Sequence, residues 1–155
     1  GMWTGGWGSV QVVNCTIATN GVCGATFTNE APVAVTNCVV WGNADDLDVS
    51  ASTPIAVQYC DVGDGDYAGT DGNFSADPLF VDPVSGNYRL QYGSPCIDAG
   101  TSDGAPSLDL LGLRRRDIPF MPNTGGGIRP WYDIGAYEAQ WHGWWWHGHW
   151  WHWHW

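Results

Sequence analysis

The chain has 155 residues, enough for one domain with a modest core. It carries 16 acidic residues against 5 basic ones, all of them arginines, and its net charge of -11 argues against binding to nucleic acid or to an anionic membrane surface. No apolar run reaches the ~20 residues of a membrane-spanning helix. No signal peptide follows Met2, so we expect a mature or excised piece. The lysine-free, Gly/Asn/Asp/Thr-rich composition predicts an extracellular or cell-surface protein.

A repeat dominates the first half of the chain. Three segments align without gaps, namely Val10–Ile17, Val33–Val40 and Ile55–Val62, at spacings of 23 and 22 residues. Within each segment apolar and polar residues alternate, which is the period of a β-strand. A unit of this length holds three short strands and three bends. The repeat therefore predicts an all-β fold, a right-handed parallel β-helix of about three coils spaced by about 4.8 Å, followed by an irregular C-terminal cap.

The bends of the coils are expected at polar residues that recur with the repeat. Asn14 and Asn37 occupy one bend, since asparagine tolerates left-handed backbone angles, and Tyr59 takes their place in the third coil. A second bend is expected at Asn20, Asn43 and Gly65.

Five cysteines are present, at positions 15, 23, 38, 60 and 96. The repeat stacks Cys15, Cys38 and Cys60 in one inward-facing file. We interpret them as small buried apolar residues, because cysteine is among the most buried residue types, rather than as a metal or redox column. Cys23 lies in a Gly-rich loop and is expected to be the reactive or intermolecular thiol.

Five motifs in the chain occur together and in the same order in a known family. They are Asn37–Asn43 (NCVVWGN), Ala76–Asp82 (ADPLFVD), Tyr88–Leu90 (YRL), Gly93–Gly100 (GSPCIDAG) and Asp133–Glu138 (DIGAYE). In these motifs the chain resembles the choice-of-anchor Q domain proteins, a group of pectin-lyase-like right-handed β-helices. The resemblance covers about residues 1–138. It implies a bacterial or archaeal secreted or surface β-helix, and it implies no particular activity.

The resemblance also divides the chain. Residues 1–76 would form the coils, residues 77–138 a closing segment and cap, and residues 139–155 a separate Trp/His tail. Ser94 to Gly100 and Asp133 to Glu138 would wrap the last coil, whose edge and core need cover. The arginines are expected to pair with acidic residues inside this cap; they are Arg89, Arg114 to Arg116 and Arg129, with Asp98, Asp109, Asp117 or Asp133 as partners.

Candidate chemistry is sparse. A lyase of this fold class needs a basic residue near its sugar-binding face, and the three repeated segments contain no arginine or lysine. No two carboxylates are clearly placed on one face for glycoside hydrolysis, so we expect a protein that is not an enzyme. Asp61, Asp64, Asp66 and Asp71 are candidate Ca²⁺ ligands, because Ca²⁺ prefers oxygen ligands in flexible loops; the alternative is a solvated acidic turn. Asn73 is a candidate glycosylation site.

The tail, residues 141–155, holds eight tryptophans and all five histidines. Three interpretations remain open: a self-associating strand, a transition-metal site, or an added sequence foreign to the fold. The metal ligands would be His147, His149, His152 and His154.

The first coil is expected to present an uncovered edge to a partner. We therefore predict an extracellular structural or adhesive module that stacks with itself or with a longer parent chain in a fibre, sheath or stalk. The alternative is a polysaccharide-binding or polysaccharide-degrading β-helix, with Trp41, Tyr59 and Tyr67 as the aromatic residues of its groove.

Overall fold

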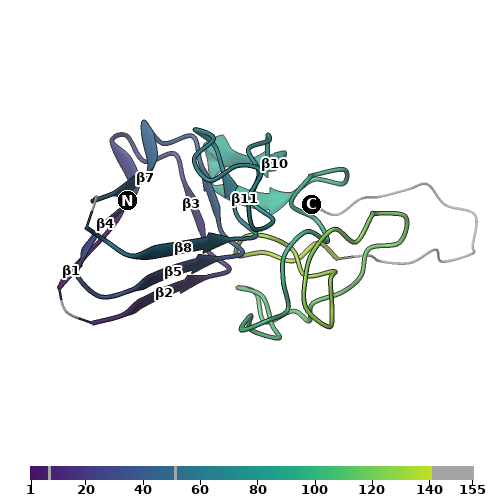
Figure 1. Ribbon diagram of the computed structural model, residues 1–155. Coiled ribbons are helices and arrows are strands. Elements are labelled where there is room, and N and C mark those ends of the chain that lie inside the picture. Colours follow the sequence, from purple (N-terminus) through teal and green to yellow (C-terminus); the bar gives the residue numbers. More distant parts are fainter. Residues whose placement is uncertain (7, 51, 141–155) are drawn as a thin grey trace, which may run out of the picture.

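A computed structural model describes residues 1–6, 8–50 and 52–140. In this part of the chain the regular structure is β-strand, apart from one 3-10 turn (Figure 1). No helix in these ranges has the length and hydropathy of a membrane span. Among the described residues, nine strands form three parallel sheets: β1 (Met2–Gly6), β4 (Cys23–Asn29) and β7 (Asp45–Val49); β2 (Val10–Val13), β5 (Val33–Thr36) and β8 (Ile55–Gln58); β3 (Thr16–Ala18), β6 (Val39–Trp41) and β9 (Asp61–Val62).

The register of the sheets follows the sequence repeat. Val10 lies beside Val33, and Val33 beside Ile55, so the 23- and 22-residue spacings become lateral neighbours. The same holds in the other two sheets. Each pass of the chain, called a coil below, thus adds one strand to each sheet. This in-register parallel arrangement is compatible with a β-helix, and Figure 1 shows β2, β5 and β8 stacked one above another.

The alternating pattern fills the space between the sheets with apolar side chains. Phe27, Val35 and Val40 of the second coil are at most 1 % exposed. Cys38 and Cys60 are fully buried in the same cluster, with Cys15 packed against it. The predicted file of three inward cysteines is confirmed by the pairing of Thr16 with Val39 and of Val39 with Asp61, one residue further along.

The corner between the second and third sheets is turned by left-handed residues in all three coils. The φ angles are 49° at Asn14, 53° at Asn37 and 50° at Tyr59. The prediction for the two asparagines is confirmed. Tyr59 adopts the same conformation, and its ring lies against Gly72 and Gly126, where a side chain would collide with it.

The second predicted bend is shifted by one residue. The left-handed positions are Thr19 (56°) and Gly42 (68°), whereas Asn20 and Asn43 follow them with ordinary backbone angles. The asparagines form a ladder instead: the backbone N–H and the Nδ2 of Asn20 donate to Asn43 Oδ1 at 2.8 and 3.0 Å. Gly65 in the third coil is left-handed, as expected.

The loop of residues 63–74 covers the end of the third coil. Asp61 pairs with Phe74, and the ring of Tyr67 packs against the central core. Asn73 is 4 % exposed; its Oδ1 accepts from Cys60 N at 2.9 Å, and its Nδ2 donates to Val57 O at 2.8 Å. Glycosylation at Asn73 is therefore wrong as a prediction, because its amide nitrogen is buried and bonded.

The rest of the chain lies beside the coils. β10 (Phe80–Asp82) and β11 (Asn87–Leu90) form an antiparallel hairpin through the 3-10 turn η1 (Pro83–Ser85). Residues after 92 form an irregular cap, drawn in green and yellow in Figure 1 beyond the ends of β2, β5 and β8.

From the sequence we expected the cap over the last coil. In the structure the cap contacts the outer face of the third sheet instead. Val39, which points outward, is fully buried in a second core cluster with Ile134 and Cys96. Gly135 N donates to Asn37 O at 2.8 Å. A side chain at Gly135 would approach Val39 and Thr16, so only glycine lets the cap backbone approach this closely.

Candidate functional site: the open edge of the first coil

The strands of the first coil are paired on one side only within the described residues. β1, β2 and β3 each stand at the edge of their sheet. Val10 N donates to Pro32 O and Asn14 N to Thr36 O, so alternate backbone N–H groups of β2 point toward the second coil. The intervening groups, at Gln11 and Val13, point to the open side. Such an edge is a template for pairing with another strand.

Three inward side chains at this edge are only half covered, although Val12 between them is 5 % exposed. Val10, Cys15 and Ile17 are half-buried, whereas their neighbours in the second coil, Val33, Cys38 and Val40, are 2 %, 0 % and 0 % exposed, respectively. The two ends of the stack therefore differ. One end is covered by residues 63–74, and the other exposes both backbone groups and part of the core.

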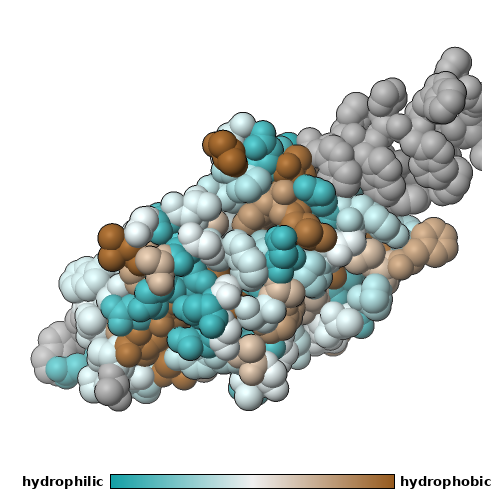
Figure 2. Space-filling view, turned by 90° about the horizontal axis from the view of Figure 1, so that it is seen from above, coloured by the Kyte–Doolittle hydropathy of each residue, from teal (hydrophilic) through white to brown (hydrophobic). Residues whose placement is uncertain are grey.

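The opposite end has a different surface. Figure 2 views the molecule from the side of β8, which stands above β5 and β2 in Figure 1, and that face carries hydrophilic and hydrophobic residues interspersed. At this covered end the edge of β8 is not free over its full length, since Val57 O already accepts from Asn73 Nδ2, and Tyr59 N directly after the strand donates to Asp71 O.

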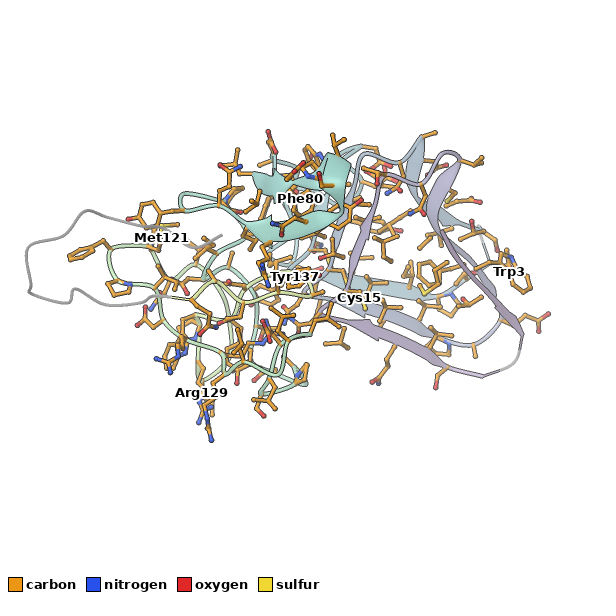
Figure 3. All side chains as sticks on the ribbon, turned by 180° about the vertical axis from the view of Figure 1, so that it is seen from behind. Trp3, Cys15, Phe80, Met121, Arg129 and Tyr137 are labelled. Atoms are coloured by element: carbon orange, nitrogen blue, oxygen red, sulfur yellow. The ribbon has the colours of Figure 1, made fainter. Side chains whose placement is uncertain are left out.

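Cys15 brings the thiol file to the open edge. A hydrogen bond with the Cys38 thiol lowers the pKa of Cys15 to about 7, against the opposing effect of partial burial. Burial, followed by its bonds to the neighbouring thiols, raises the pKa of Cys38 well above its usual value. All five cysteines are free thiols. Figure 3 shows Cys15 on the first coil, close to the cap.

We expect Cys15 to react with a thiol reagent faster than Cys38, Cys60 or Cys96 in the native protein. The thiolate is the reactive form, and a lowered pKa with partial exposure provides it near neutral pH. Peptide mass spectrometry after brief alkylation would measure this. Cys23, the residue singled out from the sequence, is also half-buried and accepts from Thr26 Oγ1 at 3.3 Å. Equal labelling of Cys38 and Cys15 would contradict the stacked core.

The Asn14–Asn37 corner joins the coils to the cap. Asn37 Nδ2 donates to Asn14 Oδ1 at 3.2 Å and to Thr101 O at 2.7 Å, while Asn37 Oδ1 accepts from Thr101 N at 2.8 Å. Asn14 Nδ2 donates to the carbonyls of Asp133 and Gly135. The two side chains thus hold segments more than sixty residues away against the coil.

Buried carboxyl groups hold the cap together internally. Asp133 Oδ1 accepts from Asp98 N at 2.8 Å, and its Oδ2 accepts from Ala139 N at 2.6 Å. Asp98 Oδ2 accepts from Ile118 N at 3.2 Å, while its Oδ1 is buried without a hydrogen-bond partner. Both side chains belong to fully buried residues. Their role is to satisfy backbone donors in a region without regular structure.

Arg115 pairs with a glutamate of the cap rather than with one of the expected aspartates. Within the described residues the salt bridge joins Arg115 Nη1 to Glu138 Oε2 at 2.7 Å, with both side chains at most 2 % exposed. Glu138 also accepts from the backbone of Arg116 and of Asp133. Three of the predicted aspartate partners, Asp98, Asp109 and Asp133, accept backbone N–H groups instead.

The buried carboxyl groups predict a stability that falls as pH rises. Burial raises the pKa of Asp98 to about 7 and of Asp61 to about 6, and it raises that of Asp133 well above the usual range. These groups prefer the neutral form when folded, so the folded state binds more protons than the unfolded one between about pH 4 and pH 7. The stability that these carboxyl groups contribute is fully present below their pKa in the unfolded chain. It is lost as the pH rises through their pKa in the folded protein.

We therefore expect a smaller free energy of unfolding at about pH 8 than at about pH 5, measured by urea denaturation. Asp98→Asn, which keeps an oxygen for Ile118 N, should reduce this difference. Asp103→Asn, an exposed change in the same cap, is the matched control and should leave it unaltered. A free energy of unfolding that rises over this interval would contradict the assignment.

The predicted Ca²⁺ ligands are held in different ways. Asp61 Oδ1 accepts from Ala76 N at 3.0 Å, and its Oδ2 accepts from the Cys96 thiol of the cap at 3.3 Å. Asp64 Oδ2 accepts from Asp46 N at 2.9 Å. Asp66 and Asp71 are exposed. In the described part of the chain, no group of three or more His, Cys, Asp or Glu side chains is arranged to hold a metal ion.

The candidate tail ligands His147, His149, His152 and His154 lie outside the described residues. The aromatic residues considered for a sugar groove have packing roles. Trp41 packs against the cap cluster, Tyr67 against the coil core, and Tyr59 against two glycines.

The burial of Asp46 was not predicted from the sequence. Asp46 is 2 % exposed, and its carboxylate accepts from Asn43 Nδ2 at 2.7 Å and from Asp64 N at 3.0 Å. The position of Asn43 three residues before Asp46 was the available signal, since such spacing lets a carboxylate close a turn.

Comparison of the chain with protein-family models, with curated proteins and with solved structures found no match. The geometry of the open edge is therefore the main indication of function.

Proposed function

We propose that this chain is a structural module of an extracellular right-handed parallel β-helix whose first coil receives a further coil. The added coil would come from a second copy or from a longer parent chain. Right-handedness is supported by the strong general preference for right-handed connections between parallel strands. The acidic, lysine-free composition supports the location, and the motif order of the sequence supports kinship with the choice-of-anchor Q domain proteins.

The observation that carries this proposal is the difference between matched side chains of the first and second coils. Val10 and Cys15 are half-buried where Val33 and Cys38 are 2 % and 0 % exposed. A further coil laid on β1, β2 and β3 would bury these side chains and bond the outward N–H groups at the same time. Both contributions favour association. Burial of the apolar side chains contributes about 25 cal/mol per Å² of apolar surface.

The Asn20 ladder is already suited to an added coil. Asn20 donates twice to Asn43 Oδ1, and the Asn20 Oδ1 accepts from the ammonium of Gly1 at 2.7 Å. An asparagine of an added coil, placed as Asn20 is placed above Asn43, would donate to that same oxygen.

Two substitutions on the same strand test the proposal. Val10→Lys places a charge at the open core, whereas Gln11→Lys places the same charge on the exposed outer side of β2. We expect sedimentation velocity and negative-stain electron microscopy to show self-association or filaments for Gln11→Lys and for the unsubstituted chain. Val10→Lys should associate much more weakly than Gln11→Lys, because stacking through the first-coil edge is lost. Equal association of the two variants, or a monomer throughout, would refute stacking through this edge.

A further inference from the structure

The cap displays four leucines on a rigid hairpin, residues 108–114, called the leucine hairpin below. The exposed fractions are 46 % for Leu108, 67 % for Leu110, 48 % for Leu111 and 40 % for Leu113. Leu108 pairs with Arg114 across the hairpin. Apolar side chains gathered on one exposed turn are unusual in a monomer and mark a contact surface.

A buried aspartate fixes the shape of this hairpin. Asp109 Oδ1 accepts from Leu111 N at 2.9 Å and from Leu113 N at 2.8 Å, and Asp109 Oδ2 accepts from Glu138 N at 3.1 Å. Asp109 N also donates to Leu113 O. The leucines are therefore held in place before any partner binds, which reduces the entropy lost on binding.

Basic side chains stand beside the leucines. Arg114 and Arg116 are exposed, and neither takes part in the salt bridge of the described residues, which joins Arg115 to Glu138. All five arginines lie between positions 89 and 129, so residues 1–88 contain no arginine or lysine. A partner for this surface should combine apolar contact area with negative charge.

The coils carry a surface of that chemistry on the first sheet, called the acidic face below. Trp3, Thr26 and Asp48 lie side by side on β1, β4 and β7, and Trp3 is 70 % exposed. At its edge Asp45 N donates to the carbonyl of Val22, whose side chain is 81 % exposed. The pKa of Asp45 is raised by desolvation and then by neighbouring carboxylates, beginning with Asp48. Negative charge is therefore concentrated here.

The two surfaces lie at opposite ends of one molecule. Figure 3 shows Trp3 at the far end of the coils and Arg129 at the lower side of the cap, away from Trp3. In Figure 1, β7 and the green segment of residues 100–120 are likewise separated by the width of the molecule. A leucine hairpin therefore cannot reach its own acidic face.

We infer that the leucine hairpin of one molecule docks on the acidic face of a second copy. Arg114 and Arg116 would pair with Asp45 and Asp48, and the leucines would cover Val22 and Trp3. Because the two surfaces differ and stand at opposite ends, the contact is heterologous and repeats as an open chain unless its rotation closes a ring. It is independent of stacking through the first-coil edge.

Charge reversal on each surface provides the test. The cap variant is Arg114→Glu/Arg116→Glu, and the face variant is Asp45→Arg/Asp48→Arg, both made in the Val10→Lys background so that edge stacking is absent. We expect sedimentation equilibrium to show self-association of the parent. Each variant alone should associate at least about tenfold more weakly, because like charges then face each other.

An equimolar mixture of the two variants should recover association, since reversed charges meet reversed charges. Leu110→Glu should also abolish association, while Val84→Glu, at a valine that is 96 % exposed on the turn after β10, should not. A parent that stays monomeric, or a mixture that fails to associate while the parent does, would overturn the inference. These experiments are done without stacking through the first-coil edge. A failure of the stacking proposal therefore does not affect the test of hairpin docking.

Discussion

Asn37→Ala is expected to lower the free energy of unfolding by about 3–5 kcal/mol, since it leaves several buried polar groups unbonded. Thr101 would lose a partner for both its N–H and its carbonyl, and Asn14 would lose the donor to its Oδ1. Alanine is also strained at the φ of 53° that this corner requires. Urea denaturation at fixed pH measures the loss.

The matched control is Asn20→Ala, because Asn20 also stacks on an asparagine of the next coil but is only half-buried. We expect it to cost about 1 kcal/mol. Similar losses for the two substitutions would show that Asn37 does not connect the coils to the cap.

Arg115→Met is the second large effect, again about 3–5 kcal/mol, because it leaves a buried carboxylate without its counter-charge. Glu138 would retain the backbone donors of Arg116 and Asp133 but lose the 2.7 Å bond to the guanidinium. The Arg115 guanidinium also lies 5.5 Å from the ring centre of Tyr132.

The loss from Arg115→Met should be larger at about pH 8 than at about pH 5, since burial raises the pKa of Glu138 and its carboxyl group ionises more completely at the higher pH. Arg116→Met is the control: its backbone N–H bonds Glu138, but its side chain is exposed. That substitution should change the free energy of unfolding by no more than about 0.5 kcal/mol. An equal loss of unfolding free energy for Arg115→Met and Arg116→Met would show that the Arg115 guanidinium is not the charge that stabilises Glu138.

The coils were predictable from the sequence because apolar residues alternate along each strand and the strands repeat at a fixed spacing. Alternation assigned Val33, Val35 and Val40 to the core, and the repeat spacing set the register that the sheets show. The left-handed corners at Asn14 and Asn37 followed from the tolerance of asparagine for that conformation.

The cap was less predictable because its contacts are individual and long-range. Nothing local to Asp98 or Asp133 indicates that each would accept backbone donors from segments about twenty to thirty-five residues distant. The placement of the cap on the outer face of the third sheet depends on Gly135, which lets the chain approach Val39. The presence of a glycine at position 135 does not by itself indicate which surface the cap backbone approaches.

The open edge was expected from the sequence, but its chemical character came from the structure. The lowered pKa of Cys15 arises from the neighbouring Cys38 thiol, a contact between different coils. The four exposed leucines of the leucine hairpin would pass as core residues by composition; their exposure follows from the turn that Asp109 fixes.

Residue-resolved amide hydrogen exchange of Val10→Lys, the variant in which stacking through the first-coil edge is expected to be absent, tests the central claim most directly. An in-register stack with an open first coil predicts alternation along β2, with fast exchange at Gln11 and Val13 and slow exchange at the substituted position, at Val12 and at Asn14. In β5 every amide from Val33 to Thr36 should be protected. Uniform protection along β2, or unprotected amides in β5, would contradict the stacked arrangement and its open edge.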